Sequence, residues 1–118
     1  GIFESYNGLR AGTTYFDANL TNAVPASYIR TALYDGSLAT NAKNQYRLNG
    51  SLMTPSYGGS NLGTSNFGTY PLYLFARAGT SLWFNGQFYG AIICGASKTT
   101  AEIQQAESYE NQKAGGLY

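Results

Sequence analysis

The chain has 118 residues, enough for one compact domain, and seven Lys and Arg against six Asp and Glu give a net charge of +1. Charged residues make up 11%, less than half of the roughly 25% in an average soluble domain. Because no run of like charge occurs, we expect neither nucleic-acid binding nor a polybasic membrane anchor. No apolar stretch approaches the roughly 18 residues that a spanning helix needs, so we expect no membrane insertion. The sequence contains one cysteine and no histidine, which excludes an internal disulfide and removes the commonest general base and metal ligand.

The first half of the chain predicts strands separated by turns. Residues 11–17 and 27–34 show alternating side-chain character, and the second run leads into Asp35-Gly36, a strong turn signal. Residues 44–54 predict a hairpin around Asn49-Gly50, because both central residues of a type I′ turn take positive φ. Residues 55–71 are so rich in Gly and Ser that they predict a long surface loop.

The second half predicts three more strands, at residues 72–78, 81–84 and 87–94, with a tight turn at Asn85-Gly86 between the last two. The run at residues 87–94 is the most apolar in the chain. We therefore expect it to be a buried strand.

A helix is predicted at the end of the chain. Thr99 and Glu102 form a T-x-x-E capping box, and Gly115-Gly116 are suitable C-terminal stops. An apolar stripe spaced by three residues predicts the packed face, and polar residues are expected to be exposed. The stripe is Ile103, Ala106 and Tyr109, and the residues expected in solvent are Gln104, Gln105, Glu107 and Asn111.

Four stretches resemble the C-terminal half of a concanavalin A-like, laminin-G-like jelly roll of phage and prophage surface proteins. They are YIRTALYDGS (28–37), YRLNGSLMT (46–54), PLYLFARAG (71–79) and FNGQFYGAIICGASKTTAEIQQAESYENQKAG (84–115). The resemblance implies a mainly β fold, an antiparallel β-sandwich (lectin-like jelly roll) with one short C-terminal α-helix. Residues 1–118 would then form a single domain, the C-terminal part of a larger concanavalin A-like domain.

Such domains usually have further strands before the position of Gly1. A sandwich that lacks part of one sheet exposes apolar faces and open edges, which soluble proteins avoid. We therefore expect partners: either other virion chains or N-terminal strands of a longer polypeptide cover this surface, and we expect an oligomer.

Residues that carry catalysis or bind metal are not evident. Glycosidases on this sandwich resemble one another in a strand run of alternating acids, which is missing here, and the helical Glu102, Glu107 and Glu110 are explained by capping and exposure. Cys94 ends an apolar strand with no histidine to activate it, so we expect a buried, inert thiol. Asp17 and Asp35 are alternatives for calcium ligation, although turn roles explain them better. We predict no catalytic residue, metal site or cofactor.

Aromatic and amide residues of the Gly-rich loop are the candidate ligand-binding residues. A rigid ring stacks on the apolar face of a sugar while amide and hydroxyl groups bond its hydroxyls, although the same rings could merely pack the loop onto a sheet. For Trp83 we expect packing in the core or at its rim. The predicted binding residues are Tyr57, Asn61, Asn66, Phe67 and Tyr70.

Together with the resemblance, these features predict a non-enzymatic surface domain of a phage particle, such as a fibre, spike or decoration domain, that binds host cell-surface glycan. The predicted location is the virion surface, outside the cell. Two alternatives stay open: a purely structural virion assembly protein, and an accessory carbohydrate-binding module of a larger polysaccharide-degrading enzyme. Fold alone does not decide among them.

Overall fold

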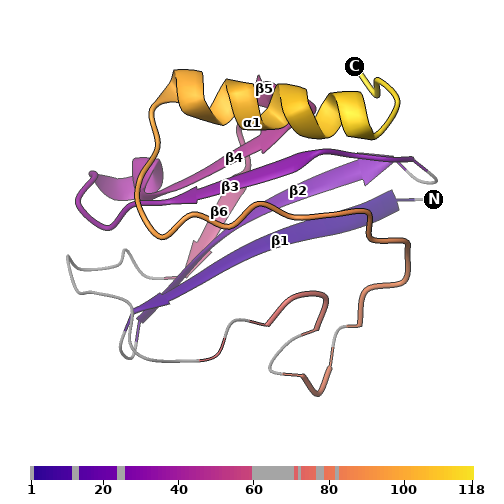
Figure 1. Ribbon diagram of the computed structural model, residues 1–118. Helices are drawn as coiled ribbons and strands as arrows, with labels where there is room; N and C mark the ends of the chain where they lie inside the picture. The colour runs from indigo at the N-terminus through magenta and orange to yellow at the C-terminus, as the bar shows by residue number, and fades with distance from the viewer. Residues whose placement is uncertain are drawn as a thin grey trace.

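The computed structural model describes residues 2–11, 14–23, 26–59, 71, 73–76, 79–81 and 83–118. This part of the chain is mainly β, as predicted, with two three-stranded antiparallel sheets and one C-terminal helix (Figure 1). The strand orders are β1-β2-β6 and β3-β4-β5. The elements are β1 (Ile2–Ala11), β2 (Thr14–Ala23), β3 (Arg30–Tyr34), the 3-10 helix η1 (Thr40–Lys43), β4 (Asn44–Leu48), β5 (Ser51–Leu52), β6 (Ser56–Gly59) and α1 (Thr100–Lys113).

The first sheet begins with a long antiparallel pair. β1 and β2 are ten residues each and pair from Ile2↔Ala23 to Ala11↔Thr14. The single strand predicted at residues 11–17 is therefore wrong, because the chain reverses direction inside it. Asp17 is also not in a turn, since it lies within β2 opposite Gly8 of β1 and Gly58 of β6.

The second sheet contains the predicted hairpin. β4 pairs with β5 through Leu48↔Ser51, and the two residues between them, Asn49 and Gly50, have φ of 47° and 76°. These angles confirm the type I′ prediction. Asn49 also fixes the start of β3, because its Oδ1 accepts from Ile29 N at 2.8 Å and its own N–H donates to Ile29 O at 2.8 Å.

The turn predicted at Asp35-Gly36 is also present. Asp35 O accepts from Leu38 N at 3.3 Å, and the Asp35 carboxylate accepts from the backbone N–H and the hydroxyl of Ser37 at 2.9 and 2.6 Å. This is the local hydrogen bonding that makes Asp a turn residue. The turn leads into η1, which precedes β4 directly.

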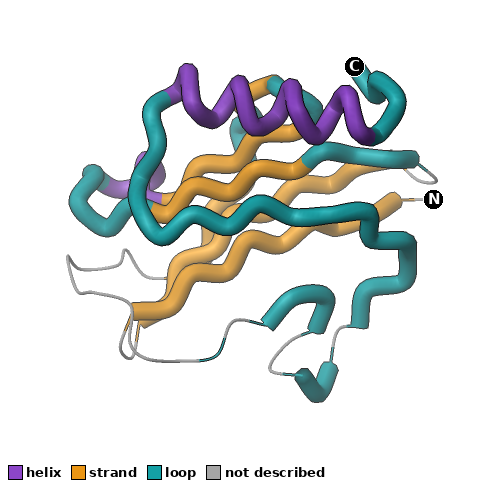
Figure 2. Tube along the Cα trace, in the orientation of Figure 1, coloured by secondary structure: helices purple, strands orange, loops and turns teal. Residues whose placement is uncertain are grey.

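The second sheet lies between α1 and the first sheet, as Figures 1 and 2 show. Thr31 of β3 lies opposite Arg47 of β4, and both hydrogen-bond to Glu107, so α1 covers their face. Side chains alternate along a strand. Tyr46 consequently points to the other face, toward β1 and β2, where it is only 1% exposed.

Helix α1 begins and ends as predicted. Thr99 and Glu102 form both bonds of the capping box, and Gly115 and Gly116 take φ of 84° and 77° beyond its last turn. The predicted faces are partly wrong. Glu107 is buried and Tyr109 is 54% exposed, because the covered face of the sheet presents Arg47, which pairs with a carboxylate rather than with a ring.

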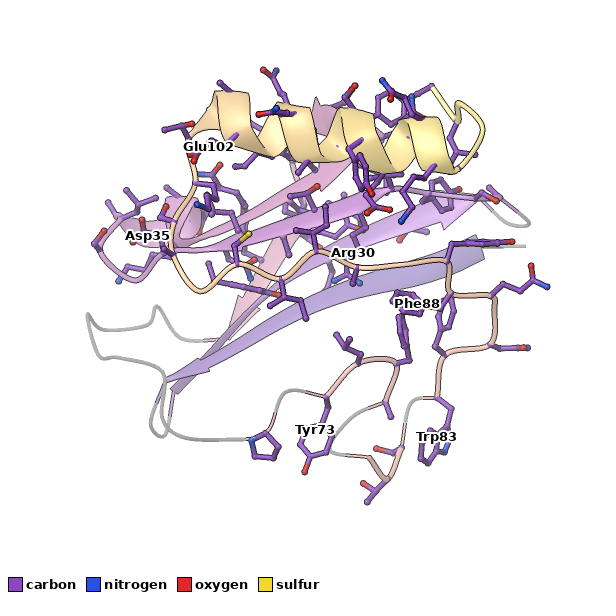
Figure 3. The ribbon with its side chains drawn as sticks, in the orientation of Figure 1. Arg30, Asp35, Tyr73, Trp83, Phe88 and Glu102 are labelled. Atoms are coloured by element: carbon purple, nitrogen blue, oxygen red, sulfur yellow. The ribbon has the colours of Figure 1, made fainter. Side chains whose placement is uncertain are left out.

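The strands predicted at residues 72–78, 81–84 and 87–94 do not form in the described residues. Apart from one bridged residue, Ser81, the described positions from 71 to 98 belong to no strand, and the Asn85-Gly86 hairpin is absent. Trp83 is 67% exposed and lies at the edge of the molecule, away from both sheets (Figure 3), and Cys94 is exposed, so both were wrongly placed in or near a core. β propensity alone did not decide their structure, because a strand needs a partner to pair with.

Among the described residues, no helix has the length and apolar character needed to cross a bilayer.

Candidate functional site

Tyr57 is the predicted binding residue whose position the structure describes. It lies in β6, opposite Ala18 of β2, and is half-buried. The Gly-rich stretch was predicted to be loop throughout, so β6 is a correction: Ser56–Gly59 adds a third strand to the first sheet. The other four predicted residues, Asn61, Asn66, Phe67 and Tyr70, lie outside the described residues.

A shallow hollow of about 280 Å³ lies beside Tyr57. Its walls come from three parts of the chain: η1 with the start of β4, the hairpin strand β5 with the residue after it, and β6. The lining residues are Asn41, Ala42, Gln45, Leu52, Met53 and Tyr57. Its volume is just below the roughly 300–1,000 Å³ of drug-sized ligand sites, so it suits one small ring.

Two carboxamides share this hollow with the tyrosine. Asn41 is exposed on η1, and Gln45 on β4 is held by a hydrogen bond of 3.4 Å from its Nε2 to Ala42 O. Sequence analysis missed both, because they lie outside the Gly-rich loop. The signal that could have found them is the amide-rich run TNAKNQ at residues 40–45, directly before the predicted hairpin.

The described lining of the hollow consists of amide, phenol, thioether and aliphatic groups, and these described residues include no Asp, Glu, Lys, Arg or Cys. An aromatic face, apolar side chains and two amides can hold a neutral, hydroxyl-rich ring in one orientation. The arrangement is therefore suited to binding such a ring.

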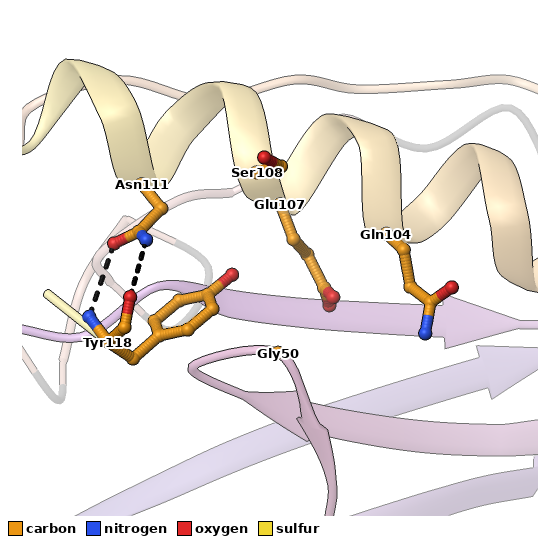
Figure 4. Close-up of a pocket in the computed structure, with 6 residues that line it drawn as sticks. All are labelled: Gly50, Gln104, Glu107, Ser108, Asn111 and Tyr118. Atoms are coloured by element: carbon orange, nitrogen blue, oxygen red, sulfur yellow. Dashed lines mark hydrogen bonds between the residues drawn. The ribbon is translucent and has the colours of Figure 1, made fainter. Parts of the chain in front are cut away.

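A second hollow, of about 250 Å³, lies between α1 and the Asn49-Gly50 turn (Figure 4). Glu107 extends from α1 to this hollow and is 4% exposed. Its Oε1 accepts from Arg47 Nε at 2.8 Å and from Thr31 Oγ1 at 2.7 Å, and its Oε2 accepts from Arg47 Nη2 at 3.0 Å. The hydrogen bond to Glu107 raises the pKa of the Arg47 guanidinium.

The end of the chain closes this second hollow. Asn111 Oδ1 accepts from the backbone N–H of Leu117 and of Tyr118, at 2.6 and 3.4 Å, and its Nδ2 donates to Tyr118 O at 2.8 Å (Figure 4). The Tyr118 ring lies against Gly50, where an added Cβ would be 2.8 Å from Cε2. The polar groups of Glu107, Asn111 and Tyr118 are thus used in bonds within the protein, so this hollow joins helix, hairpin and C-terminal residues. Gln104 and Ser108 also line it.

The carboxylates of Asp35 and Glu102 have structural roles, because each accepts hydrogen bonds from residues close to it in the sequence. Hydrogen bonds from Ser37 lower the pKa of Asp35, and those from Thr99 lower the pKa of Glu102. Within the described part of the chain, no three His, Cys, Asp or Glu side chains gather into a metal-binding group. Among these groups we find no site that competes with the hollow at Tyr57.

A comparison with known proteins finds no matching family model, no matching curated protein and no matching solved structure.

Proposed function

We propose that this chain is a non-enzymatic surface domain of a phage particle and that it binds a host cell-surface glycan. The observation that carries the proposal is the hollow in which Tyr57 meets the carboxamides of Asn41 and Gln45. A pyranose ring stacks on the phenol ring while its hydroxyls bond the amides. The glycan site then lies at β6 and η1, and we propose that Asn61, Asn66, Phe67 and Tyr70, which follow β6 in the sequence, extend it.

The location on a virion and the wider architecture rest on the sequence resemblance. We propose that the two small sheets belong to a larger concanavalin A-like jelly roll whose further strands are supplied by another chain or another part of the polypeptide. The stacking of the second sheet between α1 and the first sheet is compatible with such an arrangement (Figure 1).

A non-catalytic role is supported by the state of the described carboxylates. Glu107 forms an ion pair with Arg47, and Glu102 accepts a hydrogen bond in the capping box at the helix start. Asp35 accepts a hydrogen bond from Ser37 within its own turn. Glycoside hydrolysis needs two carboxyl groups placed roughly 5–10 Å apart across the sugar. These three groups instead hold secondary structure together.

One observation favours a second candidate function, a structural role in virion assembly. The segment after residue 82 exposes large apolar side chains, among them Trp83, Tyr89 and Ile93 at 67%, 76% and 67%. Large exposed apolar patches are typical of interaction sites with other proteins. An assembly role does not exclude glycan binding, because this segment lines neither hollow.

The test is a glycan array of bacterial surface oligosaccharides probed with the 118-residue chain. Tyr57→Ala should reduce the signal about tenfold or more if the ring stacks on a sugar. The matched control is Tyr109→Ala, which removes an exposed ring from α1 and should leave the signal unchanged.

Since Tyr57 is half-buried, Asn41→Ala with Gln45→Ala provides a second variant that keeps the ring in place. Both amide deletions together should weaken the same array signals while circular dichroism shows an intact fold. Full binding by this double variant, or no binding by the parent chain, would overturn the glycan proposal.

A further inference from the structure

The segment Gln87–Cys94 is extended but belongs to no sheet. In Figure 2 it is part of the loop trace that crosses the molecule below α1. Among the described residues, positions 85–98 make no backbone–backbone hydrogen bond with one another or with any other segment. An extended backbone with open N–H and C=O groups is a template for pairing with another strand.

The side chains of this segment are also uncovered. Tyr89 and Ile93 are 76% and 67% exposed, and Phe88 and Ile92 are 54% and 50% exposed. These are β-branched and aromatic residues, which favour strands. Phe88 contacts Phe75, with ring centroids 4.7 Å apart, and the Tyr89 hydroxyl donates to Gln87 Oε1 at 2.6 Å. Among the described residues, the backbone of the segment and most of the surface of Tyr89 and Ile93 nevertheless remain uncovered.

Charge does not oppose a second copy of this chain as the partner of this segment. No charged residue occurs between Gly79 and Ser97, and the net charge of the chain is only +1. Two identical segments can therefore meet without like-charge repulsion, and nothing in the segment selects an acidic or a basic partner.

We propose that Gln87–Cys94 pairs antiparallel with the same segment of a second copy, related by a two-fold axis at Ala91. In this register Ala91 lies opposite its own copy, and each Tyr89 lies opposite an Ile93. These two are the most exposed large side chains of the segment, and aromatic residues stabilise strands when they lie opposite β-branched ones. A two-fold axis makes the contact self-complementary and closed.

The exposed area suits a weak dimer. At about 150–250 Å² for a whole large side chain, the exposed fractions of the four large apolar residues of the segment amount to roughly 500 Å² per copy. Two copies together offer roughly 1,000 Å², about the least that a specific interface buries. The four residues are Phe88, Tyr89, Ile92 and Ile93.

Sedimentation velocity of the full chain, at concentrations up to about 1 mM, tests the proposal. The parent chain should form a dimer, and Ile93→Lys, which replaces the apolar side chain opposite each Tyr89 by a charged one, should raise its dissociation constant about tenfold or more. Gln105→Lys makes the same charge change at an exposed helical position and should leave the dimer intact. A parent chain that stays monomeric, or an Ile93→Lys variant that dimerises like the parent, would overturn it.

Cross-linking tests the register separately from affinity. With Cys94 replaced by Ser, Ala91→Cys places two thiols opposite each other at a Cα separation of about 4.5–5.5 Å, within disulfide range. Oxidation should give a covalent dimer far faster than it does with Ala101→Cys, an exposed control at the helix start. Equal rates would refute the pairing at Ala91. The glycan proposal uses other residues and another readout, so either proposal can fail alone.

Discussion

Replacing Glu107 by Ala removes the carboxylate through which α1 is hydrogen-bonded to the second sheet. Glu107 receives three hydrogen bonds, two from Arg47 and one from Thr31, and the two side chains of the ion pair are only 12% and 4% exposed. The substitution leaves the Arg47 guanidinium charged and largely out of water. Removing one partner of a buried pair typically costs about 3–5 kcal/mol.

The structure places the expected cost at the lower end of this range. Arg47 Nη2 also donates to Gly50 O, so one acceptor survives the substitution. We therefore expect Glu107→Ala to lower the free energy of unfolding by about 3 kcal/mol, a large part of the roughly 5–15 kcal/mol of a typical domain. Urea unfolding followed by circular dichroism at the helix band measures it.

Two further variants separate charge burial from simple loss of contact. Arg47→Met combined with Glu107→Leu removes both charges and should lie within about 1 kcal/mol of the parent, because no buried charge is left unpaired. Glu110→Ala, on the same helix and without an ion pair among the described residues, should change stability by less than about 0.5 kcal/mol. A cost below about 1 kcal/mol for Glu107→Ala, or a double variant as unstable as the single one, would refute the reasoning.

Three other predictions concern the turn, the helix start and a buried phenol. Gly50→Ala should destabilise the fold by about 1–3 kcal/mol in urea unfolding, because Gly50 has φ of 76° and its new Cβ would lie 2.8 Å from the Tyr118 ring. Thr99→Ala should cost about 0.5–2 kcal/mol through loss of the cap. Hydrogen bonds from the backbone N–H and the hydroxyl of Thr99 hold the pKa of Glu102 below its ordinary 4.5. This stabilisation is therefore present above pH 4.5 and is lost as the pH falls through the lower folded value; acid titrations of the parent should show the loss, and Glu102→Gln, which has no carboxylate to protonate, should not. Burial raises the pKa of Tyr34 above its ordinary 10.0, so its contribution is present below pH 10.0 and is lost as the pH rises through the folded value; alkaline unfolding should be shallower in Tyr34→Phe, and equal slopes would contradict this.

The features that sequence predicted well are local ones. The Asn49-Gly50 turn, the Asp35 turn and the Thr99 capping box each depend on residues within a few positions of one another. Their φ values and hydrogen bonds follow from the chemistry of the side chains present. These features could therefore be predicted without any information on the rest of the fold.

Features that depend on distant segments were missed. β1 and β2 contain Ser, Asn and Gly, which are not strand formers, and they become strands by pairing with each other over ten residues. Glu107 is buried because Arg47, 60 positions away in sequence, lies beneath it. Exposure of Trp83 follows from the lack of a strand partner for its segment, which periodicity cannot reveal.

The candidate site contains one residue that could be predicted from the sequence and two that depend on distant segments. Tyr57 was predicted from composition, while its neighbours Asn41 and Gln45 were not, because η1 and β4 reach β6 only through the folding of two separate sheets.

The central claim is that the hollow at Tyr57 binds a neutral sugar. Side-chain amide signals of Asn41 and Gln45 in a ¹⁵N correlation spectrum report on it directly, with a panel of bacterial surface monosaccharides and oligosaccharides as titrants. The account predicts that a sugar which binds shifts these two amides and leaves the Asn111 amide, in the second hollow, unmoved. Shifts at Asn111 without shifts at Asn41 and Gln45, or no shift with any sugar of the panel, would contradict it.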